Sequence, residues 1–231
     1  MSASLPVRPV PPLRDGERLS REEFERRYDA MPDLKKAELI EGVVYMPSPV
    51  RQELHGGPHF DLITVLGFYR AFTPGVEGGD NSSLRLDLEN EPQPDACLFL
   101  QPALGGQVQI DPEGYIVGGP EFVAEVSAGS ASLDMGLKRR LYQRCGVREY
   151  LVWLTEEATL HWFRLEDGQY LEQTPDAEGR LRSVVFPGLW LEVPALLRRD
   201  LAAVLTTAQQ GVASVEHAAF VAELRRRNAQ P

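Results

Sequence analysis

The sequence predicts a domain of mixed helices and strands, α/β or α+β, with a central mixed β-sheet flanked by helices. Two short apolar runs, over 121–126 and 149–154, enclose a segment over 132–145 in which leucines recur at helical spacing. A strand, a helix and a second strand in this order form a crossover, which favours parallel pairing of the two strands. Hairpin patterns on either side predict that the remaining strands are antiparallel. The first run is almost wholly apolar, as in a strand buried on both faces.

Several elements are expected before this central unit. Ser20 opens the first of them with a capping box, since Glu23 follows three residues later. A turn at Gly42 suits a hairpin, and Pro58 suits the first position of a helix because it lacks a backbone N–H. The expected elements are a helix over 20–28, a hairpin over 37–46, a helix over 58–72 and strands over 83–88 and 95–100.

The second half of the chain continues this pattern. Gly146 ends the central helix, as the left-handed residue that often follows a helix. The later elements are a hairpin over 160–171, a strand over 182–186, a partly helical segment over 191–205 and an amphipathic helix over 211–227. We therefore expect a Pro-rich arm over 1–14, one domain over 15–200 and a C-terminal helical tail over 201–231.

The composition limits the function. The 231 residues carry a net charge of −10, which argues against a general nucleic-acid coat, because such proteins bind through basic residues. It does not exclude a nuclease, since a metal site needs acidic residues. No apolar run approaches the roughly 18 residues of a membrane span. Residues 1–14 also lack the apolar segment of a signal peptide, so we expect a cytoplasmic protein with no membrane partner.

Three charged residues form a candidate metal site. Asp95 and Glu125 lie in two different apolar runs, and Lys138 lies on the helix that follows Glu125. Carboxylate oxygens are the ligands that Mg²⁺ and Mn²⁺ prefer. An ion held there would polarise a phosphoryl oxygen and lower the pKa of a bound water. A nearby lysine can orient that water or stabilise developing negative charge.

The helix over 132–145 carries two distinct faces. Asp134, Lys138 and Tyr142 follow one another at intervals of four residues, so they line one face. We expect this polar row to lie at the edge of the packed face, looking toward the strand ends. The adjacent face, which we expect to pack on the sheet, carries three leucines: Leu133, Leu137 and Leu141.

These residues also have plain structural alternatives. Asp134 and Lys138 can form a solvated ion pair worth a few tenths of a kcal/mol, and Asp95, which follows a proline, can belong to a turn. Glu125 is harder to explain in this way, because an unpaired acid among apolar neighbours would be costly to bury.

Two further groups of residues carry a weaker signal. His55 and His59 have the spacing of zinc ligands on a helix, but the Gly-Gly-Pro sequence between them argues against a continuous helix there. The arginines near the central helix either face a phosphate backbone or form a solvated surface; they are Arg139, Arg140, Arg144 and Arg148.

Several of these motifs follow the order found in a known family. The motifs are 38–46 with Ser48-Pro49 and His55, then Pro94-Asp95, then 122–127 with Asp134, Lys138, Tyr142 and 146–150, and finally Tyr170 and 187–189. In this combination the chain resembles the Uma-type restriction endonuclease family, also described as a domain of unknown function. The resemblance covers roughly residues 15–200 and extends to the PD-(D/E)xK nuclease superfamily.

The resemblance implies a restriction-endonuclease-like fold and an Mg²⁺- or Mn²⁺-dependent endonuclease that hydrolyses DNA. It makes Asp95 and Glu125 metal ligands, with Glu38 as the N-terminal acid that completes the site. The superfamily's lysine two places after the second acid is missing, because Ser127 stands there, and Lys138 matches the lysine of the following helix. A non-catalytic interaction or binding module on the same fold is the alternative. A homodimer formed through the C-terminal tail is a further possibility.

Overall fold

The structure, a computed structural model, describes residues 9–46 and 50–229. Residues 1–8 of the expected Pro-rich arm, and Ser48-Pro49 of the family motif, lie outside this part of the chain. None of the helices formed by the described residues is long and apolar enough to cross a membrane.

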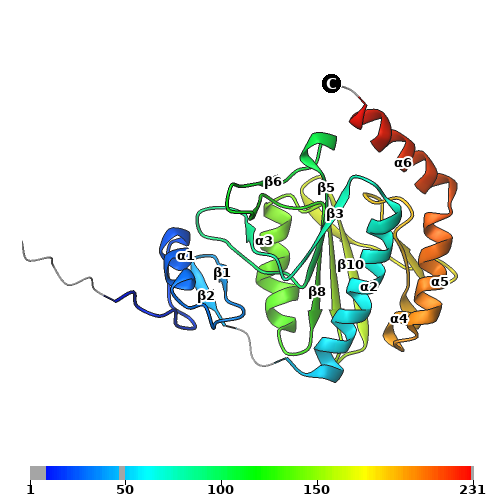
Figure 1. The fold of residues 1–231 in the computed structure, drawn as a ribbon. Coiled ribbons are helices and arrows are strands. Elements are labelled where there is room, and N and C mark those ends of the chain that lie inside the picture. The colour runs from blue at the N-terminus through cyan, green and yellow to red at the C-terminus, as the bar shows by residue number, and fades with distance from the viewer. Residues whose placement is uncertain (1–8, 47–49, 230–231) are drawn as a thin grey trace, which may run out of the picture.

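A six-stranded mixed sheet forms the centre of the molecule (Figure 1). Its order is β11-β10-β9-β8-β5-β3. The pairing of β8 with β9 is parallel, as the crossover predicts, and the other pairings in this sheet are antiparallel. The strands are β3 (Val76–Asp80), β5 (Ala96–Leu100), β8 (Phe122–Ser127), β9 (Glu149–Leu154), β10 (Thr159–Glu166) and β11 (Gln169–Glu172). The prediction of an α+β fold with a mixed sheet is therefore confirmed.

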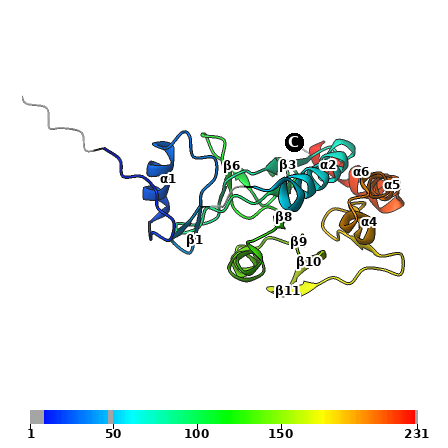
Figure 2. The ribbon, with the colours of Figure 1, turned by 90° about the horizontal axis from the view of Figure 1, so that it is seen from below.

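Helices cover both faces of the sheet. Successive side chains of a strand point to opposite faces, and on β8 this puts Phe122 and Ala124 in the larger core and Val123 in the smaller one. Figure 2 shows α3 on one face and α2 with α4 to α6 on the other. The helices are α2 (Gly57–Phe72), the π-helical turn η3 (Leu133–Lys138), which continues into α3 (Arg139–Arg144), α4 (Val193–Leu197), α5 (Leu201–Val212) and α6 (Val215–Asn228).

The N-terminal residues form a small lobe beside α3 (Figures 1 and 2). It comprises α1 (Arg21–Asp29), β1 (Glu38–Ile40) and β2 (Val43–Tyr45). The predicted capping box is present, since the Ser20 Oγ accepts the Glu23 N–H at 3.3 Å. Glu41 and Gly42 both have positive φ, 51° and 71°, as a tight hairpin turn requires. Phe24 is fully buried in the lobe's own apolar core.

Two predicted strands differ from those observed. The strand expected over 83–88 is only β4 (Leu84–Arg85), because the Asp87 carboxylate accepts the Glu89 N–H and turns the chain, leaving Leu88 77% exposed. β4 joins β6 (Gln109–Ile110) and β7 (Ile116–Val117) in a separate three-stranded sheet. The strand expected over 182–186 occurs earlier, as β12 (Arg180–Arg182), which pairs with β13 (Trp190–Glu192). A short 3-10 turn, η2, spans Pro102–Leu104.

The C-terminal helices pack on the same core as the sheet. Val204, Ala208 and Leu224 belong to the larger apolar cluster. The amphipathic helix expected over 211–227 is divided at Ser214, whose Oγ accepts the His217 N–H at 3.2 Å and begins α6. The contacts of α5 and α6 are thus made within the chain.

Candidate active site

Asp95 and Glu125 face one another across neighbouring strands. β5 and β8 are antiparallel with Ala96 opposite Ala124, so the next position outward sets Asp95 opposite Glu125, with both side chains on the face covered by α3. Each residue is 2% exposed. The Asp95 Oδ2 also accepts the Val126 N–H at 2.8 Å, which ties this carboxylate directly to β8.

The helix over η3 and α3 turns its polar row inward. Asp134, Lys138 and Tyr142 are all buried, whereas Leu133 and Leu137 are only partly covered. Of the three leucines expected to pack on the sheet, only Leu141 is fully buried. The expectation is wrong for Leu133 and Leu137, and also wrong in placing the polar row at the edge. The row is buried because Lys138 forms ion pairs with acids of the sheet, of β1 and of the row itself. The pattern of apolar residues along the helix does not predict these pairs.

Lys138 is the centre of a buried ion cluster. Its Nζ lies 2.9 Å from Glu38 Oε1, 3.0 Å from Glu125 Oε1 and 3.6 Å from Asp134 Oδ1. The Tyr142 hydroxyl donates to the same Glu125 oxygen at 3.1 Å. Carboxylates from three separate segments of the chain, β1, β8 and η3, therefore lie around one ammonium group, and the two nearer ones are within hydrogen-bond distance.

Glu38 links the N-terminal lobe to this cluster. It lies on β1, is 4% exposed, and accepts the Gln93 N–H at 2.7 Å. Ser127, which stands in place of the superfamily's lysine, lies 3.2 Å from the Ser130 hydroxyl, and Ser130 donates to Asp134 at 2.5 Å. The structure thus brings together all four sequence candidates: Glu38, Asp95, Glu125 and Lys138.

Three further side chains surround Asp95. Lys36 Nζ lies 3.2 Å from Asp95 Oδ1, His55 Nε2 lies 3.3 Å from Oδ2, and His59 Nε2 lies 2.9 Å from the Asp95 carbonyl oxygen. The two histidines lie on one continuous helical segment, since η1 (Gln52–Gly56) runs directly into α2. The expectation of a break at Gly-Gly-Pro is therefore wrong. Lys36 is absent from the sequence candidates. It lies two residues before Glu38, and in an extended chain such residues point to the same side, so this spacing could have indicated it.

The arginines on this helix and the one shortly after it do not form a single basic face. Arg139 lies over the Phe163 ring, with its guanidinium carbon 5.1 Å from the centroid, and Arg148 donates to Gln107. Arg144 extends toward Glu41, at 3.6 Å, and Arg140 is exposed. Arg139, Arg140 and Arg144 diverge because residues at these spacings on a helix point in different directions, and Arg148 lies beyond the end of the helix at Arg144.

Burial and neighbouring charges perturb the acids in opposite directions. Burial disfavours the Asp95 carboxylate, but the His55 hydrogen bond and the Lys36 charge outweigh it and hold the pKa of Asp95 well below its usual range. Burial raises the pKa of Glu125 to about 8, although Lys138 opposes the shift. The surrounding carboxylates push that pKa in the same direction as burial.

Both lysines of the site stay protonated. Burial lowers the pKa of Lys138, but the Glu125 and Glu38 carboxylates outweigh it and raise the pKa well above the ordinary lysine value. The pKa of Lys36 is likewise raised on balance, since Asp95 and other acids overcome the effect of burial.

The donor set fits a hard divalent cation in chemistry and in charge. Four buried carboxylates (Glu38, Asp95, Glu125 and Asp134) meet two lysines, so two negative charges are in excess when all are ionised. The buried Asp134 Oδ1 and His55 Nδ1 lack a hydrogen-bond partner among residues 9–46 and 50–229. Within the same residues, no three acidic, histidine or cysteine side chains are grouped as a ready metal cluster, and Lys138 lies between two of the acids.

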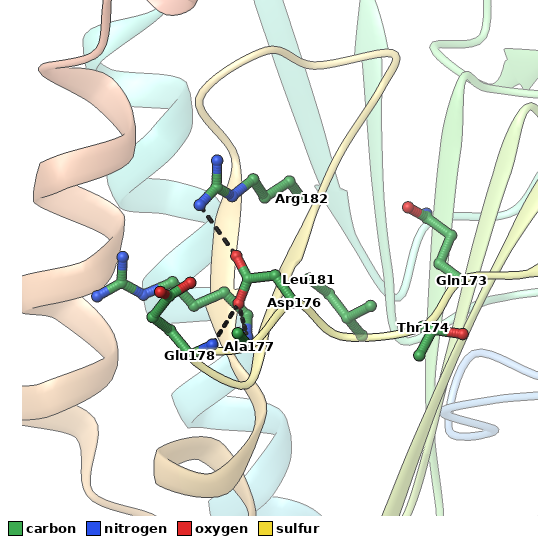
Figure 3. Close-up of a pocket in the computed structure, with 8 residues that line it drawn as sticks. Gln173, Thr174, Asp176, Ala177, Glu178, Leu181 and Arg182 are labelled. Carbon is green, nitrogen blue, oxygen red and sulfur yellow. Dashed lines mark hydrogen bonds and ion pairs between the residues drawn. The ribbon is translucent and has the colours of Figure 1, made fainter.

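A shallow hollow of about 480 Å³ lies elsewhere, on the loop between β11 and β12 (Figure 3). Asp176, Glu178 and Arg182 line it, and Arg182 donates to Asp176 at 2.9 Å. None of the buried acids described above borders it. The ion pair between Arg182 and Asp176 is a surface contact, so we assign no chemistry to this hollow.

Comparisons with known proteins agree with this fold. The Uma2 family, described as "putative restriction endonuclease", matches residues 21–194. Among solved structures, the chain is similar to a protein from Anabaena variabilis ATCC 29413 described as a putative nuclease, with 16% identity and a TM-score of 0.60, covering 78% of this chain and 98% of that chain. At this identity the likeness is one of fold. A comparison with curated proteins gives no match. Since the family model matches well over half of the 231 residues, the chain belongs to the Uma2 family of putative restriction endonucleases.

Proposed function

We propose that the protein is an endonuclease that uses Mg²⁺ or Mn²⁺ to hydrolyse phosphodiester bonds of DNA. Membership of a restriction endonuclease family supports a nuclease. In this proposal Glu38, Asp95 and Glu125 are the metal ligands, and Lys138 is the catalytic cation beside the attacking water.

One observation carries the proposal: acids from three separate parts of the chain converge around one buried lysine. Glu38, Glu125 and Asp134 come from β1, β8 and η3, and all are buried to within 4% of full coverage. A buried ion cluster contributes little to stability, because desolvation offsets the attraction between the charges. A buried acid with a strongly raised pKa beside a specific charge partner, as Glu125 is beside Lys138, is typical of a reactive site.

Each residue has a distinct part in this chemistry. The carboxylates of Glu38, Asp95 and Glu125 supply oxygen ligands on one face of the sheet. A bound divalent ion would activate a water and neutralise charge on the phosphoryl group. The Lys138 ammonium lies among the same carboxylates. When one of them turns to the metal, the N–H that it accepted from Lys138 would be free to hold the attacking water. Tyr142 fixes the Glu125 carboxylate by donating to it.

The direct test is cleavage of supercoiled plasmid and of single-stranded DNA with Mg²⁺ or Mn²⁺. Asp95→Asn keeps the shape of the side chain and removes its charge, so we expect at least a 100-fold loss of rate, roughly the effect of perturbing a metal's immediate surroundings. Glu178→Gln, at an exposed acid of the hollow between β11 and β12, is the matched control and should cleave normally. Equal cleavage by the wild type and Asp95→Asn would refute the site assignment.

A non-catalytic binding module is the second candidate. The net charge of −10 favours it, since the surface repels DNA where no metal intervenes. Lys36 and Lys138 also neutralise part of the acid cluster without any metal. Titration calorimetry with Mn²⁺ separates the candidates: the nuclease requires an ion to bind, and its affinity should fall in Asp95→Asn. No heat of binding at millimolar Mn²⁺ would favour the module.

A further inference from the structure

Lysine is rare in this chain. The 24 basic residues include only three lysines, Lys35, Lys36 and Lys138, and the rest are arginines. Two of the three lie at the candidate site. A lysine ammonium is a compact, strongly hydrated point charge, whereas arginine presents a rigid planar fork. The cations beside the acid cluster are therefore of a different kind from the arginines that make up most of the basic residues elsewhere.

The two site lysines differ in their access to solvent. The Lys138 side chain is 4% exposed, and the Lys36 side chain is 21% exposed. A DNA phosphate that approaches the cluster from solvent therefore meets the Lys36 side chain first. The Lys138 ammonium is covered by the side chains that surround it.

The two lysines also differ in the groups that surround their ammonium nitrogens. Three carboxylates surround the Lys138 Nζ at 2.9 to 3.6 Å. Among residues 9–46 and 50–229, the Lys36 Nζ has two partners, Asp95 Oδ1 at 3.2 Å and Asn81 Oδ1 at 3.4 Å. Since an ammonium has three N–H groups, Lys36 has one left to donate to a ligand.

Asp95 holds the Lys36 ammonium in a defined place. The Asp95 side chain is 3% exposed, and its other carboxylate oxygen accepts the Val126 N–H at 2.8 Å and lies 3.3 Å from His55 Nε2. A carboxylate fixed on both sides cannot follow the movements of an ordinary surface lysine. It anchors the Lys36 ammonium beside the candidate metal ligands.

Resting on the proposed hydrolysis of DNA, we propose that Lys36 is a second catalytic cation, which contacts a non-bridging oxygen of the scissile phosphate. The non-bridging oxygens carry the negative charge of a phosphodiester, and that charge increases when water adds to phosphorus. A pre-positioned ammonium stabilises this charge without reorganising during the reaction. Lys138 works from inside the cluster, and Lys36 works from the side open to the substrate.

The alternative is that Lys36 only neutralises Asp95. The two roles differ in what the loss of Lys36 changes. A neutralising role predicts altered metal binding or folding, whereas a phosphate contact predicts a slower reaction and a weaker dependence of DNA binding on salt, with the metal still bound.

The experiment compares Lys36→Met, Lys36→Arg and the control Lys35→Met. Lys35 is the neighbouring lysine and is exposed, so its loss changes the net charge equally. For each protein, calorimetry measures Mn²⁺ binding and single-turnover cleavage of plasmid measures the rate. Fluorescence anisotropy of a labelled duplex with Ca²⁺ measures the slope of log affinity against log salt.

We expect Lys36→Met to bind Mn²⁺ at least as tightly as the wild type and to lose roughly 100-fold in cleavage rate. Its salt slope should fall by about 1, the change expected for one lost phosphate contact. Lys36→Arg should recover part of the rate because it keeps the charge, and Lys35→Met should resemble the wild type.

Three results would overturn the inference: wild-type cleavage by Lys36→Met, loss of Mn²⁺ binding in that variant, or an equal loss in Lys35→Met. If the wild type does not cleave DNA, the proposed function fails. The salt dependence of DNA binding then tests the phosphate contact of Lys36 by itself. A slope lowered only in Lys36→Met would then support the phosphate contact without hydrolysis, and an unchanged slope would overturn it.

Discussion

Replacing Lys138 by methionine would test the buried ion cluster most directly. Methionine keeps the length and much of the volume of the side chain but removes the ammonium. The Glu38, Glu125 and Asp134 carboxylates would then lack the cation that lies 2.9 to 3.6 Å from them. These groups are nearly inaccessible to water, so solvent cannot readily replace the lost charge.

The magnitude follows from burial. Removing one partner of a buried ion pair destabilises a protein by about 3–5 kcal/mol, because an uncompensated charge stays buried. For a chain of this size, each kcal/mol lowers the unfolding midpoint by roughly 2–4 °C. We therefore expect Lys138→Met to unfold roughly 6–20 °C below the wild type in metal-free buffer.

Mn²⁺ should restore part of this loss. An ion bound only by the folded state stabilises it by about 2.7 kcal/mol at a concentration 100 times its dissociation constant. The gain should be larger for Lys138→Met than for the wild type, because the ion no longer competes with the ammonium. We expect the rescued variant to bind Mn²⁺ and still fail to cleave DNA, since the catalytic cation is gone.

Thermal and urea unfolding with and without Mn²⁺ measure these effects. Arg140→Met is the matched control, because Arg140 is exposed on the same helix. Unfolding of Lys138→Met within about 1 kcal/mol of the control would refute the reasoning. It would mean that the carboxylates rearrange or take up protons at little cost, and that Lys138 does not organise them.

Three further predictions concern stability. Burial, reinforced by Glu25, raises the pKa of Glu91 from 4.5 to about 8. The contribution of Glu91 to stability is therefore complete below about pH 4.5 and declines as the pH rises to about 8. Glu91→Gln should weaken the dependence of the unfolding midpoint on pH in this window, and a pH dependence equal to that of the wild type would contradict the assignment. Leu224→Ala should lose about 2–5 kcal/mol in urea unfolding, whereas Val215→Ala, at a residue 88% exposed, should change little; a small effect at Leu224 would show that the tail does not stabilise the main core. Trp162→Ala removes a fully buried ring whose centroid lies 5.6 Å from that of Phe122, and should lower the free energy of unfolding by about 3–5 kcal/mol. A decrease below about 1 kcal/mol would mean that neighbouring side chains fill the space.

Local patterns determined much of the fold before any tertiary information was needed. The hairpin turn at Glu41-Gly42 places both residues at positive φ, which Gly42 adopts without steric cost, and the two strands lie within the hairpin predicted over 37–46. The parallel pairing of β8 and β9 follows from the strand–helix–strand order, because the connecting helix returns the chain to the same edge. A short apolar strand also reveals its unusual residue, so Glu125 is recognisable as a candidate from sequence alone.

Tertiary structure decided which charged groups meet. Leu133 and Leu137 suggest one buried face of the helix, yet the buried face is the one that carries Lys138. That choice depends on Glu38 and Glu125, which lie far away along the chain and complete the coordination of the ammonium. Burying the leucines would leave those acids without a cation, at a greater free-energy cost than leaving two leucines partly exposed. The sequence by itself thus determined the elements and the candidate acids, whereas the role of Lys36 and the inward turn of Lys138 depend on long-range ion pairing.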